Sequence, residues 1–162
     1  MRRRTIAIGI AAGLVVGIQL IPVNRFNPPV EEALELPPEV AEIVRTSCYD
    51  CHSHETRWPW YSYVAPASWL VARDVREARE HLNLSVWNQY DAEERAENFE
   101  EMWEEVEDGE MPLWFYTPLH PGAKLSDEER AALRDWLGAG QGGSGREADR
   151  VGEEDGPTAE AG

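Results

Sequence analysis

The chain has 162 residues, of which 42% are hydrophobic, enough for one domain of ordinary size with a core of its own. Its 31 acidic residues outnumber its 15 Lys and Arg residues and give a formal net charge of -16 at pH 7. So acidic a chain excludes nucleic acid as a partner, because phosphate binding requires the opposite charge.

The N-terminus predicts a membrane segment. Three arginines, Arg2 to Arg4, precede an apolar run over residues 5–23, in which Gln19 is the only strongly polar side chain. This run is just long enough to span a bilayer, and its basic flank is expected to stay in the cytoplasm. A cleaved secretory signal is the alternative, but no small-x-small cleavage site follows the run. We therefore expect a single-pass anchor in a bacterial inner membrane, with the rest of the chain on the periplasmic side.

Glycines recur every fourth residue within this apolar run, at Gly9, Gly13 and Gly17. This spacing places small residues on one helix face and permits a homodimer through close helix packing. Glycine is also common in membrane helices that do not pair, so the spacing alone does not establish a dimer.

A proline-rich spacer over residues 24–38 separates this segment from the domain that follows. Its proline pairs exclude regular helix, because proline fixes φ and restricts the residue before it. From residue 39 onward, Val40, Ile43 and Val44 fall at helical spacing, so a short helix is expected to lead directly to Cys48.

Two residues separate the two cysteines of the chain, Cys48 and Cys51, and His52 follows the second directly. This pattern is typical of covalent attachment of c-type haem. Two thiols at this spacing can bond the two vinyl groups of one porphyrin, and the histidine is then the proximal iron ligand. The sequence therefore predicts one haem c held by Cys48, Cys51 and His52.

A closely spaced cysteine pair has three other uses in proteins. A zinc site needs two further thiol or imidazole ligands, and the chain has no second cysteine pair, although His54 could supply one ligand. A thioredoxin-like dithiol belongs in a βαβ pattern, which the sequence does not show. A disulfide within an interaction module is the third alternative.

An aromatic loop is expected between His52 and Leu70, because prolines interrupt it and it has no helical period. Trp58, Trp60 and Tyr61 in this loop are candidates to pack on the porphyrin or to donate hydrogen bonds to its propionates, with Arg57 as a charge partner. The alternative is an ordinary aromatic core.

Two helices are predicted next, over residues 70–82 and from a capping box at Asp91. The second has Phe99, Met102 and Val106 on one face, which predicts that Met102 is a core residue. Its other face is strongly acidic. That face is interpreted either as a docking patch for a basic redox partner or as a solvated surface in a salt-adapted organism.

Met111 precedes a proline after this helix and is the predicted sixth iron ligand, because a thioether is a soft ligand that favours ferrous iron. His120 and then His54 are the alternatives, and methionine is also common as core filler. A last helix, opened by a second capping box at Ser126, closes the domain at Leu137, and residues 138–162 are expected to form a disordered acidic tail.

Several motifs together resemble the bacterial haem-binding domain family. They are Asn27-Pro28-Pro29-Val30, Ser47-Cys48-Tyr49-Asp50-Cys51-His52-Ser53, Trp58-Pro59-Trp60-Tyr61-Ser62, Val64-Ala65-Pro66, Gly109-Glu110-Met111-Pro112 and His120-Pro121. The resemblance implies covalent haem c in an exported protein. The order of elements also resembles class I c-type cytochromes, so an all-α fold around the haem is expected over residues 39–137.

Two functions follow as hypotheses. The first is an electron carrier whose iron is held by His52 and Met111. The second is a haem enzyme or sensor, such as a peroxidase or gas-binding protein, with a displaceable sixth ligand. The electron carrier is the preferred hypothesis, and the sequence shows no recognisable substrate pocket.

Overall fold

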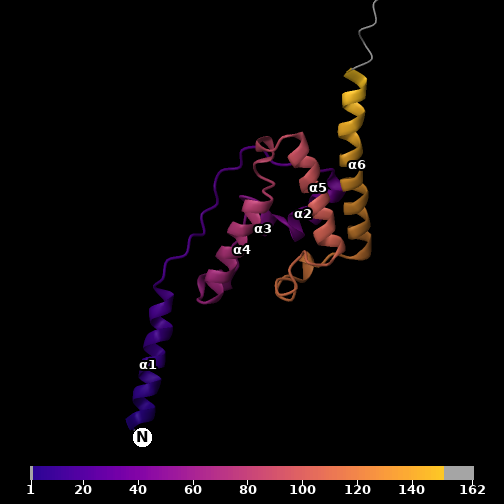
Figure 1. The fold of residues 1–162 in the computed structure, drawn as a ribbon. Helices are drawn as coiled ribbons and strands as arrows, with labels where there is room; N and C mark the ends of the chain where they lie inside the picture. Colours follow the sequence, from indigo (N-terminus) through magenta and orange to yellow (C-terminus); the bar gives the residue numbers. More distant parts are fainter. Residues whose placement is uncertain (1, 152–162) are drawn as a thin grey trace, which may run out of the picture. The chain divides into compact units, whose positions relative to one another are not determined.

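The computed structural model describes residues 2–151, and the side chains of residues 2–139. Over this range the chain is helical, with one isolated parallel β-bridge between Glu32 and Val86 and no strand (Figure 1). The α-helices are α1 (Arg2–Gln19), α2 (Pro38–Ser47), α3 (Tyr49–His52), α4 (Ala67–His81), α5 (Ala92–Glu107) and α6 (Asp127–Val151). Three 3-10 turns connect them, η1 (Trp60–Tyr63), η2 (Trp87–Gln89) and η3 (Pro121–Ala123). The predicted all-α class is confirmed.

Helix α1 differs from the predicted membrane segment at both ends. It includes the three arginines at its start and ends at Gln19, so residues 20–23 of the predicted segment lie outside it. None of its residues is buried. Among the helices of residues 2–151, we find none whose length and apolar character suffice to cross a membrane. The predicted spanning helix over residues 5–23 is therefore not found.

The chain divides into two compact units. The first comprises Met1–Ala33 and Tyr49–Val86, and the second comprises Leu34–Cys48 and Trp87–Gly162. The boundary at Cys48 places the two cysteines in different units, although only two residues separate them.

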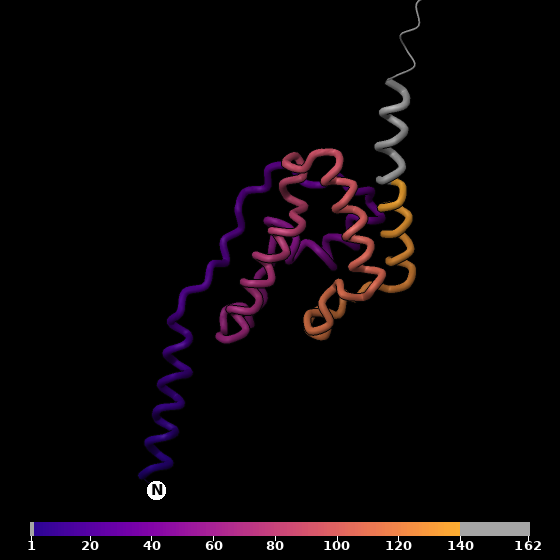
Figure 2. The backbone as a smooth tube through the Cα atoms, viewed as in Figure 1, coloured from indigo at the N-terminus to yellow at the C-terminus, as the bar shows by residue number. Residues whose placement is uncertain are grey.

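The second unit has an apolar core built by three helices. Val44 of α2, Val106 of α5 and Leu133 of α6 are almost fully buried, and α6 packs against both of the other helices. The backbone trace shows α5 and α6 running side by side (Figure 2). Met102 is buried here, as the helical spacing predicted.

Both predicted capping boxes are present in this unit. The Asp91 side chain accepts from the backbone N–H groups of Glu93 and Glu94, and the Glu94 carboxylate accepts from the Asp91 N–H at 2.9 Å. Ser126 and Glu129 exchange the same pair of bonds at the start of α6. These local bonds fix where each helix begins.

Helix α6 continues beyond Leu137 to Val151, whereas the sequence predicted a disordered tail from residue 138. Regular helix does not require an apolar period in the sequence, because its backbone hydrogen bonds are internal. The rest of the predicted tail, residues 152–162, lies outside the described residues.

The first unit has few large apolar side chains in its interior and many small polar ones. Ser53, Ser62 and Ser85 are fully buried, beside the apolar Leu84. Their hydroxyls are all hydrogen bonded, as in the bond from Ser53 Oγ to the Tyr49 carbonyl at 2.7 Å. Because buried hydroxyls need such partners, they order the loops that surround α3.

Candidate functional site

The candidate site begins where α2 ends. Cys48 caps α2 and donates its backbone N–H to the Val44 carbonyl at 2.9 Å, and α3 then carries Cys51 and His52 in a single turn. Both thiols are partly exposed and neither is in a disulfide. The predicted short helix before Cys48 is therefore confirmed, and the disulfide alternative is not observed.

His52 is held in one tautomer. Its Nδ1 lies 3.1 Å from the Leu82 carbonyl oxygen, and because a carbonyl can only accept, the proton must be on Nδ1. Burial lowers the pKa of the imidazole below its usual value, although the carbonyls of Leu82 and Ala78 oppose that shift. The ring is therefore neutral at pH 7, with the lone pair on Nε2. A histidine that binds a metal through Nε2 needs such a bond at Nδ1, because it fixes the tautomer and the orientation of the ring.

The Cys51 thiol stays protonated near neutral pH. Burial raises its pKa to about 11, the carboxylates of Asp50 and Asp74 add to that shift, and Arg79 opposes it. A protonated thiol has little tendency to bind a metal ion or to attack a disulfide, since both reactions need the thiolate. In the described part of the chain, no three His, Cys, Asp or Glu side chains gather in a way that could hold a metal ion. The zinc and dithiol alternatives thus receive no support.

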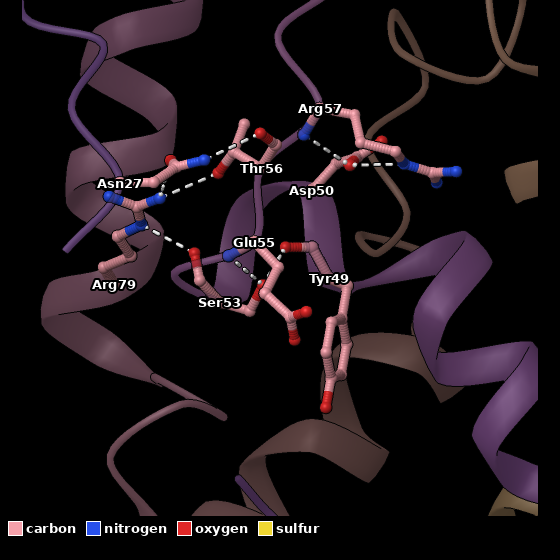
Figure 3. Close-up of polar contacts among 8 residues, drawn as sticks. All are labelled: Asn27, Tyr49, Asp50, Ser53, Glu55, Thr56, Arg57 and Arg79. Carbon is pink, nitrogen blue, oxygen red and sulfur yellow. Dashed lines mark hydrogen bonds and ion pairs between the residues drawn. The ribbon is translucent and has the colours of Figure 1, made fainter. Parts of the chain in front are cut away.

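Arg79 of α4 holds the loop that follows the motif (Figure 3). Its guanidinium donates to the Ser53 carbonyl at 2.8 Å and to the Thr56 hydroxyl at 2.8 Å. It also donates to the Asn27 side chain at 2.8 Å, and Asn27 in turn donates to the Thr56 carbonyl at 2.9 Å. One side chain therefore joins α4, the loop after His52 and the N-terminal spacer.

Both ring nitrogens of His54 form hydrogen bonds that join the loop after His52 to other segments of the first unit. Nδ1 donates to the Pro29 carbonyl at 2.7 Å, and Nε2 therefore accepts from the Asn83 side-chain amide at 2.8 Å. With both nitrogens engaged, this arrangement leaves His54 no nitrogen with which to bind iron.

The predicted aromatic residues of the loop differ in their surroundings. Trp58 Nε1 is buried and has no hydrogen-bond partner among the described residues, which makes it a donor suited to a propionate. Burial raises the pKa of Tyr61, and the charges of Cys51 and Asp50 add to the shift. Trp60, in contrast, is 76% exposed. Arg57 donates to Asp50 at 3.3 Å rather than standing unpaired for a propionate (Figure 3).

Met111 and His120 lie in the second unit. Gly109 ends α5 with φ +77°. The Met111 N–H then donates to the Glu105 carbonyl at 3.0 Å, and this bond fixes the backbone at Met111, whose side chain is partly exposed. His120 stacks on Tyr116, with ring centres 4.0 Å apart. The structure thus collects Cys51, His52 and the aromatic loop in the first unit, and the two remaining candidates for the sixth ligand in the second.

The hydrogen-bonded side chains around the motif, chiefly Arg79, Asn27 and Asn83, were not predicted from the sequence. Asn27 had a signal, because it opens one of the motifs that carry the family resemblance. Arg79 had no such signal, because in the sequence it is one more charged residue on the outer face of a predicted helix.

The residues present fit a covalent haem on three counts: two thiols that are separated by two residues and not joined in a disulfide, a neutral histidine oriented through Nδ1, and the buried Trp58 Nε1 donor, which has no partner among the described residues. Comparisons with curated proteins and with solved structures found no match. The sequence profile of one family, described as the haem-binding domain, matches residues 13–139, which is most of the chain. The protein therefore belongs to the haem-binding domain family.

Proposed function

We propose that this haem-binding protein is a c-type cytochrome that transfers single electrons. Cys48 and Cys51 would form the two thioether bonds, and His52 would bind the iron through Nε2. The haem supplies reversible one-electron chemistry at its iron. The observation that carries the proposal is the bond from His52 Nδ1 to the Leu82 carbonyl, because it leaves the ligating nitrogen unprotonated and directed by the fold.

The test is expression of the full chain in a host with c-type haem maturation. We expect a pyridine haemochrome spectrum of haem c that survives acid-acetone extraction. Cys48→Ser and Cys51→Ser should each lose a thioether bond, whereas Asp50→Asn, a change inside the motif that removes no ligand, should keep both. Extraction of all the haem from the wild-type chain would disprove covalent attachment.

We further propose Met111 as the sixth ligand, with His120 as the competing residue. The anchored backbone and partial exposure of Met111 support this choice, and so does the occupation of both His54 nitrogens. A six-coordinate iron suits electron transfer, because it changes oxidation state without binding a substrate. Rapid carbon monoxide binding by the reduced protein would contradict this assignment and favour a haem enzyme or sensor.

The Met111→Ala substitution should abolish the weak red charge-transfer band of a methionine-ligated ferric haem. His120→Ala is the matched control and should retain that band. The measurement is the ferric absorption spectrum of the wild type and both variants. Loss of the band in His120→Ala alone, or its absence from the wild type, would show that Met111 is not the ligand.

We also propose that the apolar segment over residues 5–23 directs export and attaches the domain to the outer face of the inner membrane. The three preceding arginines, the apolar side chains of α1, none of which is buried, and the extracytoplasmic site of haem c attachment support this localisation. The Gly9, Gly13 and Gly17 face remains the predicted site of a homodimer. Open space surrounds all three glycines in the structure.

A further inference from the structure

The loop between Trp58 and α4 has an exposed aromatic surface. Trp60, Tyr63 and Val64 are 76%, 59% and 47% exposed, although each is a large apolar or amphipathic side chain. Trp69 and Leu70, on the first turn of α4, are also exposed. Exposed apolar side chains that are grouped in this way mark a contact surface, whereas single exposed apolar side chains need no explanation. We call Trp60, Tyr63 and Val64 the aromatic surface.

The aromatic surface is fastened to the end of α1. The Gln19 side chain donates to the Ala65 carbonyl at 3.2 Å and accepts from the Ala65 N–H at 2.9 Å. Arg25 donates to the Ser62 carbonyl at 3.0 Å and lies over the Tyr63 ring, 4.4 Å from its centre. These four contacts hold the aromatic surface beside the C-terminal end of α1.

The two segments that meet here contain no acidic residue. Residues 1–30 and residues 57–73 lack Asp and Glu altogether and contain arginines, in a chain with 31 acidic residues. A carboxylate would be repelled by anionic lipid headgroups and would lose hydration there, whereas arginine is attracted to them. The charge distribution therefore selects a lipid surface over a basic protein as the occupant.

We propose that the aromatic surface lies in the headgroup region of the membrane and holds the haem-binding domain against the bilayer. Tryptophan and tyrosine favour this region because their rings are apolar and their N–H or O–H groups can reach water. Trp60, one of the side chains predicted to contact the haem, thus contacts lipid instead. This inference rests on the proposed membrane attachment of residues 5–23.

Photo-cross-linking of the haem-loaded full chain tests the proposal. The photoreactive residue p-benzoylphenylalanine replaces Trp60 or Tyr63, and the protein is reconstituted into vesicles that contain anionic phospholipid. Leu14 in α1 is the positive position, and Trp114, 80% exposed in the second unit, is the matched control. An unchanged haem spectrum shows that each variant is folded, and mass spectrometry identifies the adducts.

We expect lipid adducts at positions 60 and 63 in several-fold higher yield than at 114, with adducts at 14 as well. Adducts at 14 together with control-level yields at 60 and 63 would overturn the proposal and leave membrane attachment intact. Absence of adducts at 14 would overturn both. A cross-link from position 60 to the haem or to a protein would show that Trp60 contacts that group and not lipid. This result would also overturn the proposal.

Discussion

Arg79 shows how one residue can order a site without entering its chemistry. Its five-donor guanidinium reaches backbone and side-chain oxygens of segments that are 23 to 53 residues away in the chain. Burial lowers its pKa, but the group remains a cation under all ordinary conditions. It is a positioning residue, because it fixes the loop that starts at Ser53, directly after His52.

The Arg79→Lys substitution keeps the charge but cannot reproduce the planar set of bonds. We expect a loss of about 2 kcal/mol in the free energy of unfolding, since hydrogen bonds from charged donors to buried acceptors are broken. Arg76→Lys on the same helix is the control, because the ion pairs that Arg76 forms with Glu77 and Glu80 are exposed. Denaturant titration of both variants provides the comparison. Equal stabilities would show that the Arg79 contacts contribute nothing.

At the scale of elements, the parts predicted from sequence are those with local causes. The caps at Asp91 and Ser126, the helix before Cys48 and the buried stripe through Met102 depend on residues within a few turns of each other. The bonds of Arg79 and His54 join residues far apart in the chain, and no periodicity reports such pairs. The apolar segment predicted from the sequence ends later in the chain than α1 does. Apolar composition does not reveal that the Gln19 side chain donates a hydrogen bond to the Ala65 carbonyl.

Gly109 provides a test of how α5 is ended. Its φ of +77° is unfavourable for any residue with a Cβ, although nothing lies within 4 Å of where that Cβ would be. Gly109→Ala should therefore lower the free energy of unfolding by about 1 kcal/mol, for conformational reasons alone. Gly138→Ala is the matched control in helical backbone and should raise it by about 1 kcal/mol. Thermal unfolding that shifted in the same direction for both variants would contradict this account.

The whole molecule combines an acid-free N-terminal region with a strongly acidic second unit. All eleven acidic residues between Asp91 and Glu110 are exposed, and none of their carboxylates forms an ion pair with any described side chain. Charge of one sign that is exposed and unpaired attracts a partner of the opposite sign. The sequence revealed this acidic charge directly. Whether the acidic face docks a partner depends on where an electron leaves the haem, and the composition of the chain does not contain that information.

A docking role for the α5 face predicts a specific salt dependence. Electron transfer to a basic c-type cytochrome should slow as ionic strength rises, because salt screens attraction beyond a Debye length of about 10 Å at 0.1 M. Replacing Glu97, Glu100 and Glu104 on α5 with Gln should slow transfer at low salt and weaken that dependence. The control replaces Glu35, Glu39 and Glu42, which are also exposed, and so makes the same change in net charge away from α5. Stopped-flow rates that fall equally in both variants would show that net charge alone steers the partner. Rates unaffected by salt in the wild type would show that the α5 face is only solvated, because a docking patch of this charge cannot escape screening.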